Sequence, residues 1–104
     1  ALKVWTKTIE LSPKYAAAYY NRGLVYDYLN KYEKAIDDFE KALELGYAKT
    51  NYDKAKIIYR LAGNYSSTGN ATRANELTNE AIVLLKGSEE TVNSDELLES
   101  GLLN

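Results

Sequence analysis

The chain contains the stretch AAAYYNRGLVY at residues 16–26 and the stretch YEKAIDDFEKALEL at residues 32–45. In both, apolar or small side chains recur three and four residues apart, which is the period of an amphipathic helix. Asn30 lies between the two stretches and is a residue type that tolerates a left-handed turn. The sequence therefore predicts a helical hairpin, with helices over about residues 14–29 and 32–45.

The same pattern occurs in two other parts of the chain. Residues 55–82 repeat the hairpin, with Gly69 at the turn, and residues 1–11 repeat its second helix alone. The second copy is displaced because the junction after the first hairpin is long. Gly46 is expected to end the preceding helix, and Thr50 or Asn51 to cap a long helix over about residues 51–68.

These residues resemble the tetratricopeptide repeat, a helix pair of about 34 residues. The matches are spread over all three copies, at Ala1, Trp5, Pro13, Tyr19, Gly23, Tyr26, Ala35, Phe39, Ala62, Tyr65 and Ala74. The chain departs from the family pattern at Arg22 (for Leu), at Tyr47 and Lys86 (for Pro) and at Thr78 (for Phe). The resemblance implies an all-α, right-handed solenoid of antiparallel helix pairs, with about two and a half repeats.

The expected organisation is a solenoid over residues 1–86 followed by a tail over residues 87–104. Residues 1–12 form the second helix of a truncated repeat, and residues 14–47 and 51–86 form two whole repeats. The polar run at residues 87–93 is interpreted as a linker to a short capping helix or tail. The stripe of Leu2, Trp5 and Ile9 is expected to be partly uncovered, because a solenoid repeat does not bury its apolar face alone.

The composition argues against catalysis and against several classes of partner. The chain has no His and no Cys, so His-based acid–base chemistry, thiol catalysis and most transition-metal sites are not expected. Its 13 basic and 15 acidic residues do not give the basic excess that a nucleic-acid binder needs. No apolar run reaches the roughly 18 residues of a membrane span. We expect no enzyme activity, no cofactor, no metal, no nucleic acid and no membrane.

A binding surface is expected on the first helices of the two repeats, which line the concave face of such a solenoid. Lys56 and Arg60 lie four residues apart on one helical face and do not neutralise each other, so an anionic partner is favoured. The predicted peptide-binding residues are Asn21, Lys56 and Arg60 for carboxylates, and Tyr20, Leu24, Tyr28 and Tyr59 for apolar side chains. Other tyrosines, Tyr19, Tyr26 and Tyr65, are expected in the core.

A narrower resemblance concerns the dicarboxylate-clamp domains of heat-shock co-chaperones. In that subfamily an Asn on the second repeat and a Lys/Arg pair on the third hold the carboxylates of Glu-Glu-Val-Asp chaperone tails, and Asn21, Lys56 and Arg60 fall at the matching places. Two further clamp residues of the subfamily lie on a helix that this sequence lacks. The resemblance implies an adaptor that binds an acidic chaperone tail. A cytoplasmic location is expected separately, because a chain without Cys is compatible with a reducing compartment.

Two alternatives stay open. In the first, the groove binds peptides of a different specificity. In the second, the chain is a scaffold that self-associates through its exposed N-terminal helix and binds no peptide in the groove.

Overall fold

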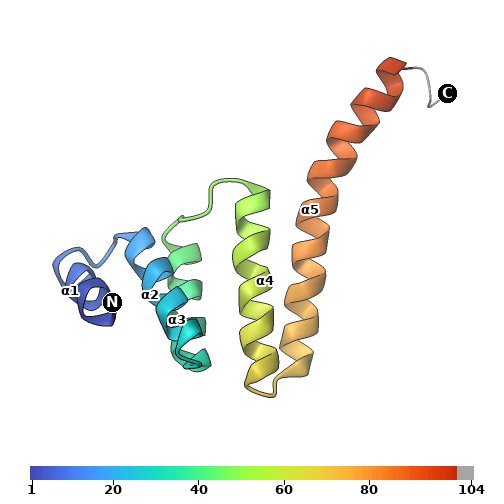
Figure 1. Cartoon of the computed structure of the whole chain (residues 1–104). Coiled ribbons are helices and arrows are strands. Elements are labelled where there is room, and N and C mark those ends of the chain that lie inside the picture. Colours follow the sequence, from blue (N-terminus) through green and yellow to red (C-terminus); the bar gives the residue numbers. More distant parts are fainter. Residues whose placement is uncertain (101–104) are drawn as a thin grey trace.

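The computed structural model of the chain describes the backbone of residues 1–100 and the side chains of residues 1–86. Over residues 1–100 it contains helices and no strand. The helices are α1 (Leu2–Leu11), α2 (Ala16–Tyr28), α3 (Tyr32–Glu44), α4 (Asn51–Ser67) and α5 (Ala71–Ser100). Each helix packs against the next one along the chain, and they stand side by side in this order (Figure 1). The expected all-α solenoid of helix pairs is confirmed.

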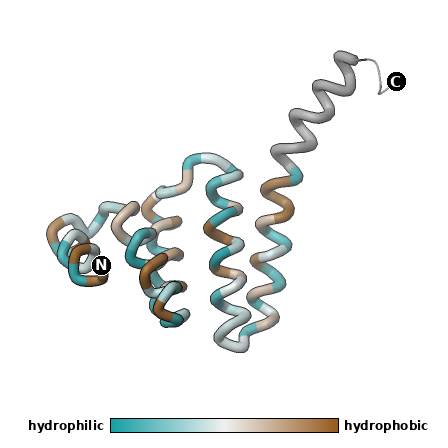
Figure 2. The backbone as a smooth tube through the Cα atoms, viewed as in Figure 1, coloured by the Kyte–Doolittle hydropathy of each residue, from teal (hydrophilic) through white to brown (hydrophobic). Residues whose placement is uncertain are grey.

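The hydrophobic core runs between α3, α4 and α5. Phe39 of α3 is fully buried, and Ile58, Leu61 and Leu77 are each at least 94% buried beside it. Apolar residues are interleaved with hydrophilic ones along the described helices, as amphipathic packing requires (Figure 2). In contrast, α1 has no buried residue, and Trp5 is only half-buried.

Close contact between α2 and α3 depends on Gly23. A Cβ atom at this position would lie 2.8 Å from Cε1 of Phe39 and 3.3 Å from Cβ of Asp38. No side chain fits in that space without displacing the Phe39 ring. The close packing of α2 on α3 therefore requires the glycine that the repeat pattern has at this position.

The helix ends follow the residues that the sequence singles out. Asn30 and Gly69 both have positive φ, 61° and 88°, at the two hairpin turns. After Asn30, the amide of Lys31 donates to the carbonyl of Tyr26, which closes the helix end in the Schellman pattern. The Thr50 hydroxyl accepts a hydrogen bond from the Asp53 amide at 3.1 Å and caps α4. The predicted hairpin turns and the long helix after Thr50 are confirmed.

The linker predicted at residues 87–93 is wrong at the level of the backbone, because α5 continues from Ala71 to Ser100 without a break. A single glycine, Gly87, costs a helix only about 1 kcal/mol relative to alanine, and no proline interrupts the segment. Residues 101–104 of the predicted tail lie outside the described residues. The division into a solenoid over 1–86 and a tail over 87–104 stays a prediction.

Candidate functional site

A hollow of about 280 Å³ lies where α2 and α4 meet the connection between α3 and α4. It is lined by Tyr20 of α2, Tyr47 of the connection, and Asp53, Lys56 and Ile57 of α4. The long junction expected from the sequence places Tyr47 there, and the capped first turn of α4 places Asp53. We call the surface formed by Tyr20, Asp27, Tyr47, Asp53, Lys56 and Arg60 the α2–α4 face.

Two stacked tyrosines form one wall of the hollow. The rings of Tyr20 and Tyr47 have centroids 4.6 Å apart and an interplanar angle of 16°. Tyr20 also contacts the buried ring of Phe39, at a centroid distance of 5.6 Å, which anchors the pair to the core. Burial raises the pKa of Tyr47, with smaller contributions from Tyr20 and from the Asp53 charge.

The two predicted cations of this face have different surroundings. An Arg60 guanidinium nitrogen lies 3.8 Å from a carboxylate oxygen of Asp27, which joins α4 to α2. Lys56 forms no ion pair with the residues whose side chains are described, and its ammonium lies 5.4 Å from the centroid of the Tyr52 ring. Asp27 therefore reaches Arg60 from the neighbouring helix, a pairing that the spacing of Lys56 and Arg60 does not reveal.

The structure brings some of the predicted site residues together and separates others. Tyr20 and Lys56 line the same hollow, and Arg60 lies one helical turn after Lys56. Leu24 packs against the hydrophobic core, and Asn21 is half-buried on α2. These five residues lie on α2 and α4, as expected, but Leu24 contributes to packing as well as to a surface.

The other two predicted residues lie apart from the hollow. Tyr59 is 60% exposed on α4 and lines none of the hollows described here. Tyr28 is 85% exposed and lines a second hollow of about 430 Å³, together with residues of α1 and α2. The remaining lining residues of this second hollow are Ala1, Leu2, Lys3, Val25 and Leu29.

Three residues of the α2–α4 face were not among the predicted contacts. Tyr47 occupies the place of the family's Pro, so its departure from the pattern was a usable signal. Asp53 is recognisable as the acidic residue of a helix N-terminal turn, three residues after the Thr50 cap. Asp27 belongs to the helix expected to line the groove, but its pairing with Arg60 depends on how α2 and α4 pack.

A buried ion pair holds α2 against α3 behind this face. Arg22 donates to both carboxylate oxygens of Asp38, at 2.7 and 2.8 Å, and Asp38 is only 4% exposed. The guanidinium also lies within 6 Å of the ring centroids of Tyr19 and Tyr26. The hydrogen bond to Asp38 raises the pKa of Arg22 above its ordinary value. Arg22 thus replaces the apolar contact of the family's Leu with an ion pair, and Tyr19 and Tyr26 flank it as half-buried residues.

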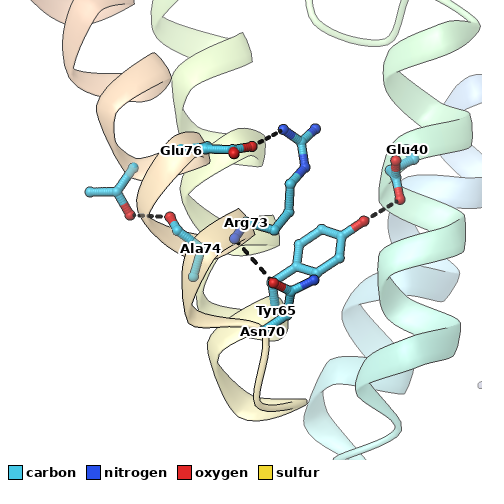
Figure 3. A network of polar contacts seen from close by, with 7 residues as sticks. Glu40, Tyr65, Asn70, Arg73, Ala74 and Glu76 are labelled. Atoms are coloured by element: carbon cyan, nitrogen blue, oxygen red, sulfur yellow. Dashed lines mark hydrogen bonds and ion pairs between the residues drawn. The ribbon is translucent and has the colours of Figure 1, made fainter.

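A second polar network ties α3, α4 and α5 together (Figure 3). The Tyr65 hydroxyl of α4 donates to a carboxylate oxygen of Glu40 on α3, at 3.0 Å. Arg73 of α5 stacks near the Tyr65 ring and pairs with Glu76 at 3.1 Å. Burial raises the pKa of Tyr65, the Glu40 hydrogen bond raises it further, and Arg73 opposes both. Tyr65 therefore adds a hydrogen bond to the contact between the two repeats.

The described part of the chain offers no cluster of three or more His, Cys, Asp or Glu side chains suited to a metal ion. Among its helices, none combines the length and apolar character needed to cross a membrane.

The sequence profile described as "Tetratricopeptide repeat" matches residues 16–45, the segment that forms α2 and α3. Residues 16–45 are a tetratricopeptide repeat. Most of the chain also superposes on solved helical-repeat structures. The structure titled "Crystal structure of MamA" has a TM-score of 0.71 at 24% identity, covering 86% of this chain and 49% of MamA. The N-terminal domain of stress-induced protein-1 from Caenorhabditis elegans has a TM-score of 0.68 at 24% identity, covering 89% and 75%. These likenesses establish the tetratricopeptide-repeat fold.

Curated relatives share the repeat over part of their length. "Tetratricopeptide repeat protein 36" of Caenorhabditis elegans is 46% identical over 50 residues, which are 48% of this chain and 28% of the relative. The "Tetratricopeptide repeat and J domain-containing co-chaperone DNJ1" of Cryptococcus neoformans var. grubii is 35% identical over 60 residues, which are 56% of this chain and 12% of the relative.

A glycosyltransferase of Giardia intestinalis, "UDP-N-acetylglucosamine--peptide N-acetylglucosaminyltransferase", is 35% identical over 68 residues, 62% of this chain and 5% of the enzyme. Because the match covers so little of the enzyme, the enzyme's catalytic activity is not inferred for this chain.

Proposed function

We propose that this chain is a protein-interaction module that binds an extended segment of a partner along the α2–α4 face. The observation that carries the proposal is the hollow that the stacked Tyr20 and Tyr47 rings line together with Lys56. The rings provide apolar contact area at low entropic cost, and Lys56 provides a charge for a carboxylate. Both features suit a peptide that ends in an apolar and an acidic residue.

The acidic C-terminal tail of a chaperone is the partner we propose. The relative from Cryptococcus neoformans is a co-chaperone by its printed name, and its repeat region is similar to this chain. Asn21, Lys56 and Arg60 supply the donors on two helices of neighbouring repeats that a carboxylate-terminated segment would need. A cytoplasmic location is part of the same proposal, because such tails are presented there.

Affinity for a short peptide is expected to be modest. Lys56 and Arg60 are both exposed, so each charge contact contributes about 1 kcal/mol or less. The expected dissociation constant is on the order of micromolar and rises with salt.

The test is calorimetric titration with an acetylated peptide ending in Glu-Glu-Val-Asp, compared with the same peptide amidated at its C-terminus. The free acid is expected to bind more tightly, and Lys56→Ala is expected to weaken it about threefold to fivefold. Lys54→Ala is the matched control, since Lys54 is an exposed lysine two residues away and therefore on another side of α4. Equal binding of the two peptides, or equal effects of the two substitutions, would contradict the proposal.

A second candidate function is a scaffold that self-associates. The observation in its favour is the second hollow, about 430 Å³, whose lining is apolar apart from Lys3. Val4 and Tyr28 nearby are 63% and 85% exposed. Sedimentation velocity over a concentration series tests this function. A dimer that is weakened by Leu29→Gln supports it, and a monomer at all concentrations refutes it.

A further inference from the structure

The pair formed by Arg60 and Asp27 gives the α2–α4 face an internal anion. The Asp27 carboxylate lies 3.8 Å from the Arg60 guanidinium, and the two side chains are 27% and 47% exposed. A ligand carboxylate that approaches Arg60 therefore also approaches the negative charge of Asp27, in a site that water still enters.

Unlike Arg60, Lys56 is available to a ligand carboxylate. It forms no ion pair with another side chain of residues 1–86, and its ammonium group lies 5.4 Å from the centroid of the Tyr52 ring. The Lys56 side chain also lines the hollow beside Tyr20 and Tyr47. An incoming carboxylate consequently meets Lys56 first, next to the aromatic wall.

Two internal carboxylates make a second ligand carboxylate unfavourable. Asp27 holds Arg60, and Asp53 lines the same hollow as Lys56. The attraction of the Arg60 guanidinium for a second ligand carboxylate is offset by the repulsion from Asp27, which carries the same charge as the ligand. Like charges brought together in this way weaken binding and serve as a means of discrimination between ligands.

We infer that Asp27 is a specificity-determining residue of the α2–α4 face. It makes the face prefer segments with one carboxylate at Lys56 and apolar neighbours on Tyr20 and Tyr47 over segments with several carboxylates. This inference rests on the proposed function, because it concerns the ligand of the same face. Segments with consecutive carboxylates also bind, but less tightly than they would bind to the same face without the Asp27 charge.

The experiment is a calorimetric titration of wild type and variants with two acetylated free-acid peptides. The first ends in Glu-Glu-Val-Asp and carries several carboxylates, and the second ends in Gln-Gln-Val-Asn and carries only its C-terminal carboxylate. Asp27→Asn is expected to tighten binding of the first peptide about twofold to fivefold and to change the second peptide less. Asp37→Asn is the matched control, because Asp37 is an exposed aspartate of α3 that lines a different hollow. The control corrects for the change in net charge.

The outcomes separate this inference from the proposed function. If the wild type binds both peptides and Asp27→Asn acts like Asp37→Asn, the role of Asp27 is refuted while the binding face stands. If neither peptide binds any variant at millimolar concentration, the proposed function fails and the inference fails with it.

A measurement without ligand tests the ion pair itself. The melting temperatures of Asp27→Asn, Arg60→Gln and the double variant form a double-mutant cycle. A double variant that loses less than the sum of the two single losses supports the pair. Strictly additive losses show that Asp27 does not hold Arg60, and they overturn the inference independently of any peptide.

Discussion

Replacing Arg22 with the Leu of the family pattern should destabilise this chain, although substitutions toward a family consensus commonly stabilise proteins. Arg22 donates to both oxygens of Asp38, and the Asp38 side chain is only 5% exposed. In the Arg22→Leu variant that carboxylate stays buried between α2 and α3 without its partner.

The magnitude follows from the surroundings of the pair. Removing one member of a buried ion pair costs about 3–5 kcal/mol, and the contacts of the guanidinium with the Tyr19 and Tyr26 rings add about 0.5–1 kcal/mol each. The Arg22 side chain is 19% exposed, and the new leucine gains apolar burial, so both effects reduce the loss. We expect a net loss of about 2–4 kcal/mol in the free energy of unfolding, which lowers the Tm of a chain of this size by roughly 10–25 °C.

Urea unfolding followed by circular dichroism at 222 nm measures this loss. Lys7→Leu is the control, because Lys7 pairs with Glu10 in an exposed setting where the pair contributes at most a few tenths of a kcal/mol. The double variant Arg22→Leu/Asp38→Ala should be more stable than Arg22→Leu alone, since it removes the unpaired buried charge. An Arg22→Leu variant at least as stable as the wild type would refute this account of the pair.

Two further predictions concern packing and the contact between repeats. Gly23→Ala should cost about 1–3 kcal/mol, because its Cβ would lie 2.8 Å from Phe39, whereas Gly63→Ala, with no atom within 4 Å of its Cβ, should gain up to about 1 kcal/mol. Urea midpoints measure both, and equal effects of the two substitutions would contradict the packing argument. Tyr65→Phe should lose about 1 kcal/mol with the hydrogen bond to Glu40. The pKa of Tyr65 is raised in the folded state. The contribution of Tyr65 to the free energy of unfolding is therefore fully present below the ordinary tyrosine pKa of about 10, and it is lost as the pH rises through the folded value. Above pH 10 the stability of Tyr65→Phe should consequently fall less steeply than that of the wild type.

The helices and turns were predictable because they depend on local chemistry. Asn30 and Gly69 mark the hairpin turns through their tolerance of positive φ, and Thr50 marks the start of α4 through its capping hydroxyl. The small residue at Gly23 likewise signals the close approach of α2 to α3. Each signal lies within one or two helical turns of the feature that it specifies.

Pairings between helices were harder to foresee. Arg22 and Asp38 are 16 residues apart in the chain, and their contact depends on the rotation of α2 against α3. The pairing of Asp27 with Arg60 depends in the same way on how one repeat stacks on the next. Charged residues on amphipathic helices have several partners within reach, so spacing alone does not choose among them.

The helical stretch around Gly87 shows another limit. The polar residues 87–93 resemble a linker in composition, but glutamate and most small polar residues cost a helix only tenths of a kcal/mol each. Composition therefore does not separate a polar helix from a polar linker when no proline is present.

The central claim is that a carboxylate-terminated segment binds the α2–α4 face. The most direct test is a ¹⁵N chemical-shift titration of this chain with the acetylated Glu-Glu-Val-Asp peptide. We predict that the largest amide shifts cluster at Tyr20, Tyr47 and residues 53–60, and that the amidated peptide gives much smaller shifts at the same positions. Shifts confined to α1 and the Tyr28 end of α2, or equal shifts with the two peptides, would contradict the claim.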